Sequence, residues 1–368
     1  MQGGVGAYSQ IMARQFAHQG HEVYVLSSQQ AQEIQPQIHL DTLSNWSITT
    51  LIKIRRWAQT QKLDIINLQF ETAAYSMSPW IHFLPQMVNI PVVTTFHDLL
   101  FPYLFPKAGR LRNWIVMHLA RVSAGVIATN HEDMEKLNHL SRVRLIPIGS
   151  NINRVFPPDF DAQSWREKLG AAPDDLLIAY FGFINHSKGV DTLLQAAAEL
   201  AQHNFPFRLL MIGGRTGSSD PTNASYADEI DQLIDQLGLA PSIHWTGFAD
   251  DAAVTAYLQA SDVVILPFRD GASYRRGTLM AAIDHGCPII TTQPKVDIPA
   301  FKSGENMLLV PPEDPKALAD AIHRFRGEGT ELRIKLSKGA LELSKHFDWS
   351  LIAQDTLALF EHILGEHR

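Results

Sequence analysis

The sequence predicts an α/β protein built from two doubly wound, Rossmann-like domains. Two observations support this fold class. Short, continuous runs of Val, Ile and Leu recur along the chain, and amphipathic stretches of helical period separate them. Continuous apolar runs are typical of strands buried on both faces of a parallel sheet. Their regular alternation with helices favours right-handed crossover connections.

The composition agrees with this class and excludes several functions. Of 368 residues, 45% are hydrophobic and 19% charged, and 31 Lys and Arg against 38 Asp and Glu give a net charge of −7. This balance excludes a strongly basic nucleic-acid binder. The single cysteine, Cys287, excludes a disulfide framework and a cysteine-based metal centre. With no signal peptide and no run of about 18 apolar residues, we expect a cytoplasmic protein.

Apolar runs place the expected strands. The first half has five, at residues 21–28, 64–70, 91–99, 125–130 and 143–149. The second half has six, at residues 176–184, 207–214, 243–249, 262–268, 288–292 and 307–310. Helical period between the runs predicts helices at residues 190–201, 227–237, 252–258, 278–284 and 315–325.

The alternation pauses at residues 151–161, where two prolines indicate an interdomain linker. We therefore expect an N-terminal domain over residues 1–155, a C-terminal domain over 156–345 and a final helix over 346–368. Two such sheets that face each other leave a cleft at the carboxyl ends of their strands, where ligands bind in this architecture.

The N-terminus departs from the usual plan of this fold. A doubly wound domain opens with a strand, but here the glycine turn at residues 3–6 comes first, and a helix is expected at 7–19. We expect the first strand to be missing, through truncation or a misassigned start codon; the alternative is a protein that never had it. A chain without it is expected to be less stable, because neighbouring strands lack a partner.

Three segments have the residues of an anion site. Gly3, Gly4 and Gly6 precede a helix, so their backbone can approach a phosphate, although a tight turn also needs glycine. Lys188 lies where a helix begins, a place that normally disfavours a cation, so an anionic partner would explain it; the alternative is a solvated lysine. Residues 267–279 form an arginine-rich loop before a helix, which we interpret as an anion pocket rather than an exposed basic loop.

One histidine and the absence of known motifs complete the candidates. His97 ends a predicted strand, where a neutral imidazole would hydrogen-bond a sugar hydroxyl; the alternative is a histidine satisfied within the fold. The sequence has no HExxH, no Walker A motif and no GxSxG elbow. We therefore predict no metal site.

The ordered set of these features resembles the GT-B glycosyltransferases of the family 4 type over nearly the whole chain. In the N-terminal half the resemblance rests on the glycine loop and following strand at 3–9 and 21–23, on His97-Asp98 and on the interdomain segment 146–150. In the C-terminal half it rests on the "KG" motif at 188–191, the "F-x-G"-like strand at 245–248 and the segment 282–288. Residues 347–349 and the following helix resemble the segment that crosses back to the N-terminal domain in that family.

The resemblance implies a retaining, metal-independent hexosyltransferase. Such enzymes transfer a sugar from a nucleotide-diphosphate sugar, a co-substrate rather than a cofactor, to an acceptor that is here unidentified: a glycan, a lipid-linked acceptor or a small molecule. By this resemblance His97 contacts the transferring sugar and Lys188 stabilises the pyrophosphate. The implied donor-binding residues are Gly3, Gly4, Gly6, Gly182, Asn185, His186, Ile212, Gly213, Gly247, Phe248, Asp270, Arg275, Arg276, Gly277, Thr278 and Leu279.

The sequence departs from the family pattern at three positions. Phe183 stands where the family has an arginine, and Ser273 and Ala281 stand where it has two glutamates. One hypothesis is that Asp270 replaces the first glutamate, and that Arg275 and Arg276 replace the lost positive charge.

Other functions remain open on the sequence alone. The departures motivate a catalytically silent GT-B paralogue that acts as a binding or scaffold subunit. An epimerase hypothesis is weaker, because this sequence shows no carboxylate pair at the expected cleft. A dehydrogenase hypothesis is weaker too, because no acidic residue follows the second expected strand. Residues 101–121 combine aromatic residues with four Lys or Arg, so they form either a peripheral membrane contact or an ordinary packed helix.

Overall fold

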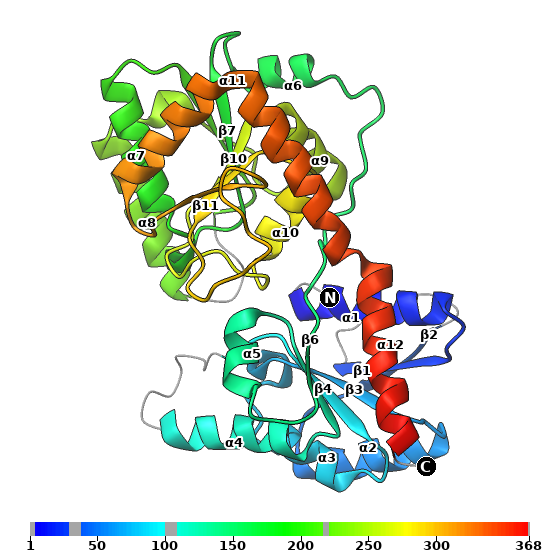
Figure 1. Ribbon diagram of the computed structural model, residues 1–368. Helices are drawn as coiled ribbons and strands as arrows, with labels where there is room; N and C mark the ends of the chain where they lie inside the picture. The colour runs from blue at the N-terminus through cyan, green and yellow to red at the C-terminus, as the bar shows by residue number, and fades with distance from the viewer. Residues whose placement is uncertain (1–3, 29–37, 100–108, 216–220, 367–368) are drawn as a thin grey trace. The chain divides into compact units, whose positions relative to one another are not determined.

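Two α/β units make up the structure, a computed structural model that describes residues 4–28, 38–99, 109–215 and 221–366 (Figure 1). Unit 1 comprises Met1–Asn151 and Asp348–Arg368, and unit 2 comprises Ile152–Phe347. The expected boundaries at residues 155 and 345 fall within a few residues of these divisions. All pairs between the described strands are parallel, which confirms the predicted α/β class.

The described strands of unit 1 form two sheets. A two-stranded sheet pairs β1 (Val23–Ser28) with β2 (Ile38–Leu43), and a four-stranded sheet has the order β3 (Ile66–Phe70), β4 (Val92–Phe96), β5 (Gly125–Ala128), β6 (Val143–Leu145). Within the described residues no strand joins β1 to β3. The strand β2 was not predicted, because polar residues interrupt it and most of its side chains are exposed or half-buried.

Helices cover the sheets of unit 1. They are α1 (Gly4–His18), α2 (Ile48–Thr60), α3 (Leu84–Met87), α4 (Gly109–Val122), α5 (His131–Leu137) and α12 (Trp349–Glu366), with short 3₁₀ turns η1 (Thr72–Tyr75) and η2 (Trp80–Phe83). The helix α1 begins earlier than predicted, so Gly4 and Gly6 belong to its first turn rather than to a loop before it. Gly3 lies outside the described residues.

The first and last helices pack side by side in unit 1 (Figure 1). Met12 of α1 and Ile363 of α12 share one apolar cluster with Val93 of β4 and Ile127 of β5. The indole Nε1 of Trp349 donates a hydrogen bond of 2.6 Å to the Ser150 carbonyl. Burial of these side chains, at roughly 25 cal/mol per Å² of apolar surface, anchors α12 in this unit.

Unit 2 contains one six-stranded sheet of order β12-β11-β10-β7-β8-β9. These strands are β7 (Leu176–Phe181), β8 (Phe207–Ile212), β9 (Ile243–Trp245), β10 (Val263–Leu266), β11 (Ile289–Thr292) and β12 (Leu308–Val310). All six coincide with predicted runs. Their side chains are mostly buried, which explains why the runs are continuous rather than alternating.

The helices of unit 2 follow the strands in order. They are α6 (Ala162–Lys168), α7 (Val190–Gln202), α8 (Pro221–Gln236), α9 (Asp251–Ala260), α10 (Gly277–Asp284) and α11 (Pro315–Ser344), with 3₁₀ turns η4 (His186–Lys188), η5 (Ala240–Ser242) and η6 (Lys345–Phe347). The helix α11 extends well beyond its predicted end because it resumes after Gly329, whose φ of 59° breaks the helical path. No helix among the described residues is both long and apolar enough to cross a bilayer.

Candidate functional site

The loops that follow β7, β8 and β9 meet at one edge of the unit 2 sheet. The Gly182 N–H donates to the Ile212 carbonyl at 2.9 Å, and the Gly213 N–H donates to Oγ1 of Thr246 at 3.1 Å. Gly213 also forms an isolated bridge with Gly247. The structure thus brings together Gly182, Ile212, Gly213 and Gly247. Their glycine backbones leave room for a ligand to approach closely.

The turn η4 positions Lys188. Asn185 directly precedes this turn. Its side-chain oxygen accepts hydrogen bonds from the Ser187 N–H at 2.9 Å and from the Ser187 hydroxyl at 2.8 Å. Gly189 ends the turn with φ 64°, and a Cβ at this position would overlap the Pro267 carbonyl. Only glycine combines this backbone conformation with this close approach, so Gly189 fixes where Lys188 lies.

The Lys188 side chain points back toward the sheet edge. A Cβ added to Gly182 would overlap Nζ of Lys188 and would lie 3.2 Å from Cγ2 of Thr278, in the first turn of α10. Burial, and secondarily the charge of Arg276, lower the pKa of Lys188 to about 8. A cation that the protein desolvates in this way is stabilised when an anion binds beside it.

Two arginines accompany this lysine. Asp270 forms an ion pair with Arg275 at 2.6 Å and a second ion pair with Arg276. Nη1 of Arg276 donates to the Ser187 hydroxyl at 3.2 Å, and its guanidinium lies 4.8 Å from the centre of the Phe268 ring. These contacts fix Arg276 beside the turn that carries Lys188.

The start of α10 completes the anion site. Gly277 and Thr278 open the helix and Leu279 is fully buried behind them, while the side chain of the preceding Arg276 makes no capping hydrogen bond. First-turn N–H groups and the helix dipole attract negative charge. Together with Lys188 and Arg276 they form a positively polarised candidate anion site.

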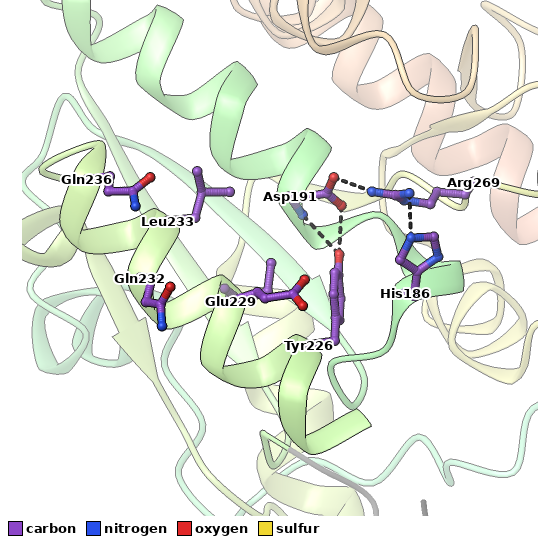
Figure 2. A pocket seen from close by; sticks show the side chains of 9 residues that line it. His186, Asp191, Tyr226, Glu229, Gln232, Leu233, Gln236 and Arg269 are labelled. Carbon is purple, nitrogen blue, oxygen red and sulfur yellow. Dashed lines mark hydrogen bonds and ion pairs between the residues drawn. The ribbon is translucent and has the colours of Figure 1, made fainter. Parts of the chain in front are cut away.

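A pocket of about 310 Å³ adjoins the turn η4, and His186 of that turn lines it (Figure 2). Figure 2 shows Asp191 between Arg269, with which it forms an ion pair, and Tyr226, whose hydroxyl donates to it at 2.7 Å. Arg269 also contacts Nε2 of His186 at 2.7 Å and forms an ion pair with Glu313 at 3.2 Å. These bonds tie η4 to α7, α8 and the loop after β10. Arg269 therefore connects the turn η4 to α7 and to Glu313.

Three predicted site residues, His97, Gly4 and Gly6, lie in unit 1. His97 follows β4, and its Nε2 lies 2.9 Å from Oε1 of Gln69. Tyr8 packs edge-on against the imidazole with 4.7 Å between ring centres. Burial lowers the pKa of His97 to about 4, so the ring is neutral at physiological pH. The same helix that supplies Tyr8 begins with Gly4 and Gly6.

The structure also places the residues that depart from the family pattern. Phe183 is half-exposed just beyond β7, whereas Ser273 and Ala281 are buried. Phe248, after β9, has 89% of its surface exposed. Sequence reasoning missed Gln69 and Ser187, which contact His97 and Arg276. For Gln69 the available signal was the alternation of polar and apolar residues in β3, and for Ser187 it was the polar turn before Lys188. Among the described residues no group of three or more His, Cys, Asp or Glu side chains is arranged to hold a metal ion.

Each of the two units matches a family model of glycosyl transferases. The family model described as Glycosyltransferase Family 4 matches residues 2–154, and the model described as Glycosyl transferases group 1 matches residues 175–326. The D-inositol 3-phosphate glycosyltransferase of Acidothermus cellulolyticus is 27% identical over 62% of this chain and 49% of its own length. The phosphatidyl-myo-inositol mannosyltransferase of Mycobacterium leprae is 27% identical over 84% of this chain and 76% of its own.

Solved structures share the fold over the full chain. A sucrose-phosphate synthase from Thermosynechococcus elongatus has a TM-score of 0.78 at 21% identity and covers 99% of this chain and 94% of its own. Anabaena Alr3699/HepE, in complex with UDP and glucose, has a TM-score of 0.77 at 18% identity, and the match covers 97% of this chain and 96% of that one.

The two parallel α/β units have the GT-B fold of these solved structures. The chain belongs to the group 1 glycosyl transferases, with an N-terminal unit of family 4. The first curated relatives match it over about half to two thirds of their own length.

Proposed function

We propose that this chain transfers a sugar from a nucleotide-diphosphate sugar to an acceptor, with retention of anomeric configuration and without a divalent cation. One observation carries the proposal: the Lys188 ammonium lies at the sheet edge beside the start of α10, with Arg276 close by. Cationic side chains and helix N–H groups take over the charge neutralisation that a metal ion supplies elsewhere.

The charge of the leaving diphosphate determines the role of each residue. Lys188 and the first turn of α10 neutralise it as the bond to the sugar breaks. Arg276, oriented by Asp270 and Ser187, replaces the arginine that the family has at the position of Phe183. This arrangement supports an anion-binding protein over a scaffold subunit, and a transfer assay separates an active enzyme from a silent binding subunit.

The exposed ring of Phe248 supports a nucleobase site. It follows Gly247, which bridges to Gly213, so the ring stands at the rim of the glycine-lined edge. Aromatic faces stack on bases of any sequence. The UDP complex of the Anabaena structure supports a uridine nucleotide as the first one to test.

The acceptor is a carbohydrate, a lipid-linked molecule or a small molecule. The relative from Mycobacterium leprae is named for a lipid-linked acceptor. In α4, Leu111 is 66% and Trp114 51% exposed, which supports contact of this cytoplasmic protein with a membrane surface. Residues 101–108 lie outside the described part of the chain. Co-sedimentation with anionic liposomes, compared between the natural protein and Trp114→Ser, tests this contact.

A thermal-shift and transfer assay tests the function itself. We expect UDP, GDP, ADP or dTDP to raise the melting temperature of the protein in EDTA, because a ligand that binds the folded state stabilises it. Lys188→Met is expected to lose most of this shift, whereas the exposed Lys335→Met control keeps it. NMR of the product from the matching nucleotide sugar reports the anomeric configuration. No binding of any nucleoside diphosphate, or transfer only with Mg²⁺ or Mn²⁺, contradicts the proposal.

A further inference from the structure

A line of polar side chains runs along one face of β3 and β4 and ends at His97. Because side chains alternate between faces along a strand, Asn67 and Gln69 share one face of β3. Gln69 pairs in register with Thr95 of β4. His97 comes directly after β4 and two positions after Thr95, and its N–H continues the ladder to the Phe70 carbonyl, so its side chain lies on the same face as that of Thr95. The Asn67 Nδ2 group donates to the Val93 carbonyl at 3.1 Å and to Oγ1 of Thr95 at 3.0 Å. Gln69 Nε2 donates in turn to Oδ1 of Asn67.

The Val93 carbonyl fixes the direction of every bond in this line. A carbonyl oxygen only accepts hydrogen bonds, so the end of the Asn67 amide that meets it is the NH₂ group. The oxygen of Asn67 therefore faces Gln69 and accepts from the Gln69 NH₂ group. This orientation turns the Gln69 oxygen toward His97, where Nε2 lies 2.9 Å away.

The proton on the His97 ring follows from this orientation. The Gln69 oxygen cannot donate, so Nε2 of His97 carries a hydrogen and donates it. The ring is buried and neutral, so this is its single exchangeable proton. Nδ1 then presents a lone pair, and among the described residues the hydrogen bonds of the ring involve Nε2 alone. Tyr8, packed edge-on at 4.7 Å, limits rotation of the ring.

We propose that Asn67 and Gln69 are positioning residues that hold His97 in its Nε2–H tautomer, so that Nδ1 accepts a hydrogen bond from a sugar hydroxyl. The inference rests on the proposed function, because it takes the ligand at His97 to be the sugar undergoing transfer. It specifies that ligand further: the group that meets His97 is a hydrogen-bond donor, so a deoxy or O-methyl sugar at that position loses the contact.

Long-range ¹H–¹⁵N NMR of the full chain, labelled with ¹⁵N-histidine, reads this tautomer directly. The His97 signals are those that disappear in His97→Gln. At pH 7 without ligand we expect a protonated Nε2 and an unprotonated Nδ1. A wild-type spectrum with the proton on Nδ1, or an equal mixture of tautomers, overturns the proposal. Because the spectrum needs no substrate, it stands apart from any failure to find transferase activity.

Two variants at Gln69 separate positioning from packing. Gln69→Leu removes the acceptor, so we expect the Nε2–H preference to disappear and kcat/KM to fall about tenfold, the value of one hydrogen bond. Gln69→Glu restores an acceptor, so this variant is expected to keep the Nε2–H tautomer. The charge of the new carboxylate raises the pKa of His97, which adds an acidic limb to the pH profile of kcat/KM. A Gln69→Leu protein that keeps the wild-type tautomer overturns the proposal even if its activity falls.

Discussion

Nζ of Lys188 lies so close to Gly182 that a single methyl group on that glycine would overlap it. The two residues come from different segments, the loop after β7 and the turn η4. The same Cβ would also lie 3.2 Å from Cγ2 of Thr278, in the first turn of α10. The absence of a side chain at Gly182 therefore makes the space that the ammonium occupies. This relationship connects backbone conformation to ligand affinity and can be tested by adding one carbon.

Gly182→Ala is expected to weaken nucleoside diphosphate binding at least tenfold. The new Cβ displaces the ammonium, and φ of 131° adds backbone strain of about 1–3 kcal/mol. Gly238→Ala is a matched control, because Gly238 also has a positive φ, 66°, but has nothing within 4 Å of an added Cβ. Isothermal titration and urea unfolding measure both effects. Equal losses of affinity in the two variants would show that strain alone is responsible.

The affinity for a nucleoside diphosphate is expected to fall as the pH rises above about 8. Burial and Arg276 lower the pKa of Lys188 to that value in the free protein, and the anion binds the protonated form better. Affinity then drops roughly tenfold per pH unit until the higher pKa of the complex is reached. In Lys188→Arg the guanidinium stays charged, so this alkaline limb should vanish. Titration calorimetry from pH 7 to 10 measures the effect, and an unchanged limb in that variant would assign it to another group.

Arg276→Ala is expected to have two opposite effects. Loss of a guanidinium lowers diphosphate affinity roughly 10- to 100-fold, the range for a charge-assisted hydrogen bond. Loss of the like charge near Lys188 also raises the pKa of that lysine, so the alkaline limb moves to higher pH. Arg324→Ala is the control, because Arg324 is exposed on α11 and pairs only with Glu328 on its own helix among the ion pairs described. An unchanged affinity in Arg276→Ala would exclude Arg276 from the anion site.

The sequence predicted the sheet of unit 2 better than that of unit 1. Strands such as β7 and β8 are buried on both faces, so an unbroken apolar run marks them. In β2 the burial alternates, and His39 and Asp41 disguise the strand as a polar segment. The end of α11 was missed because Gly327 and Gly329 favour a stop, whereas packing of Leu332 and Leu336 against the core carries the helix onward.

The sequence singled out the residues of the candidate anion site but not the contacts that organise them. Lys188 was identifiable because a cation at a helix start is unfavourable without a partner. The partners of Arg269 and Arg276 were not identifiable, because the same residue type in the same loop pairs with Asp191 in one case and with Asp270 in the other. The contact between Gln69 and His97 depends on strand register, which no local pattern encodes.

Acid is expected to destabilise unit 1 through His97. In the folded protein burial lowers the pKa of His97 to about 4, against about 6.5 in the unfolded chain, so protons bind the unfolded state first as the pH falls. The neutral, buried His97 therefore makes its full contribution to the free energy of unfolding above pH 6.5. As the pH falls to about 4, the free energy of unfolding decreases by on the order of 3 kcal/mol. In His97→Gln this loss is absent, so the difference in unfolding free energy between the two proteins should narrow over that range. Histidines common to both, such as His82 and His285, cancel in the comparison. Urea unfolding followed by tryptophan fluorescence at pH 7, 5.5 and 4 measures it, and parallel pH profiles would show that His97 takes up its proton as readily folded as unfolded.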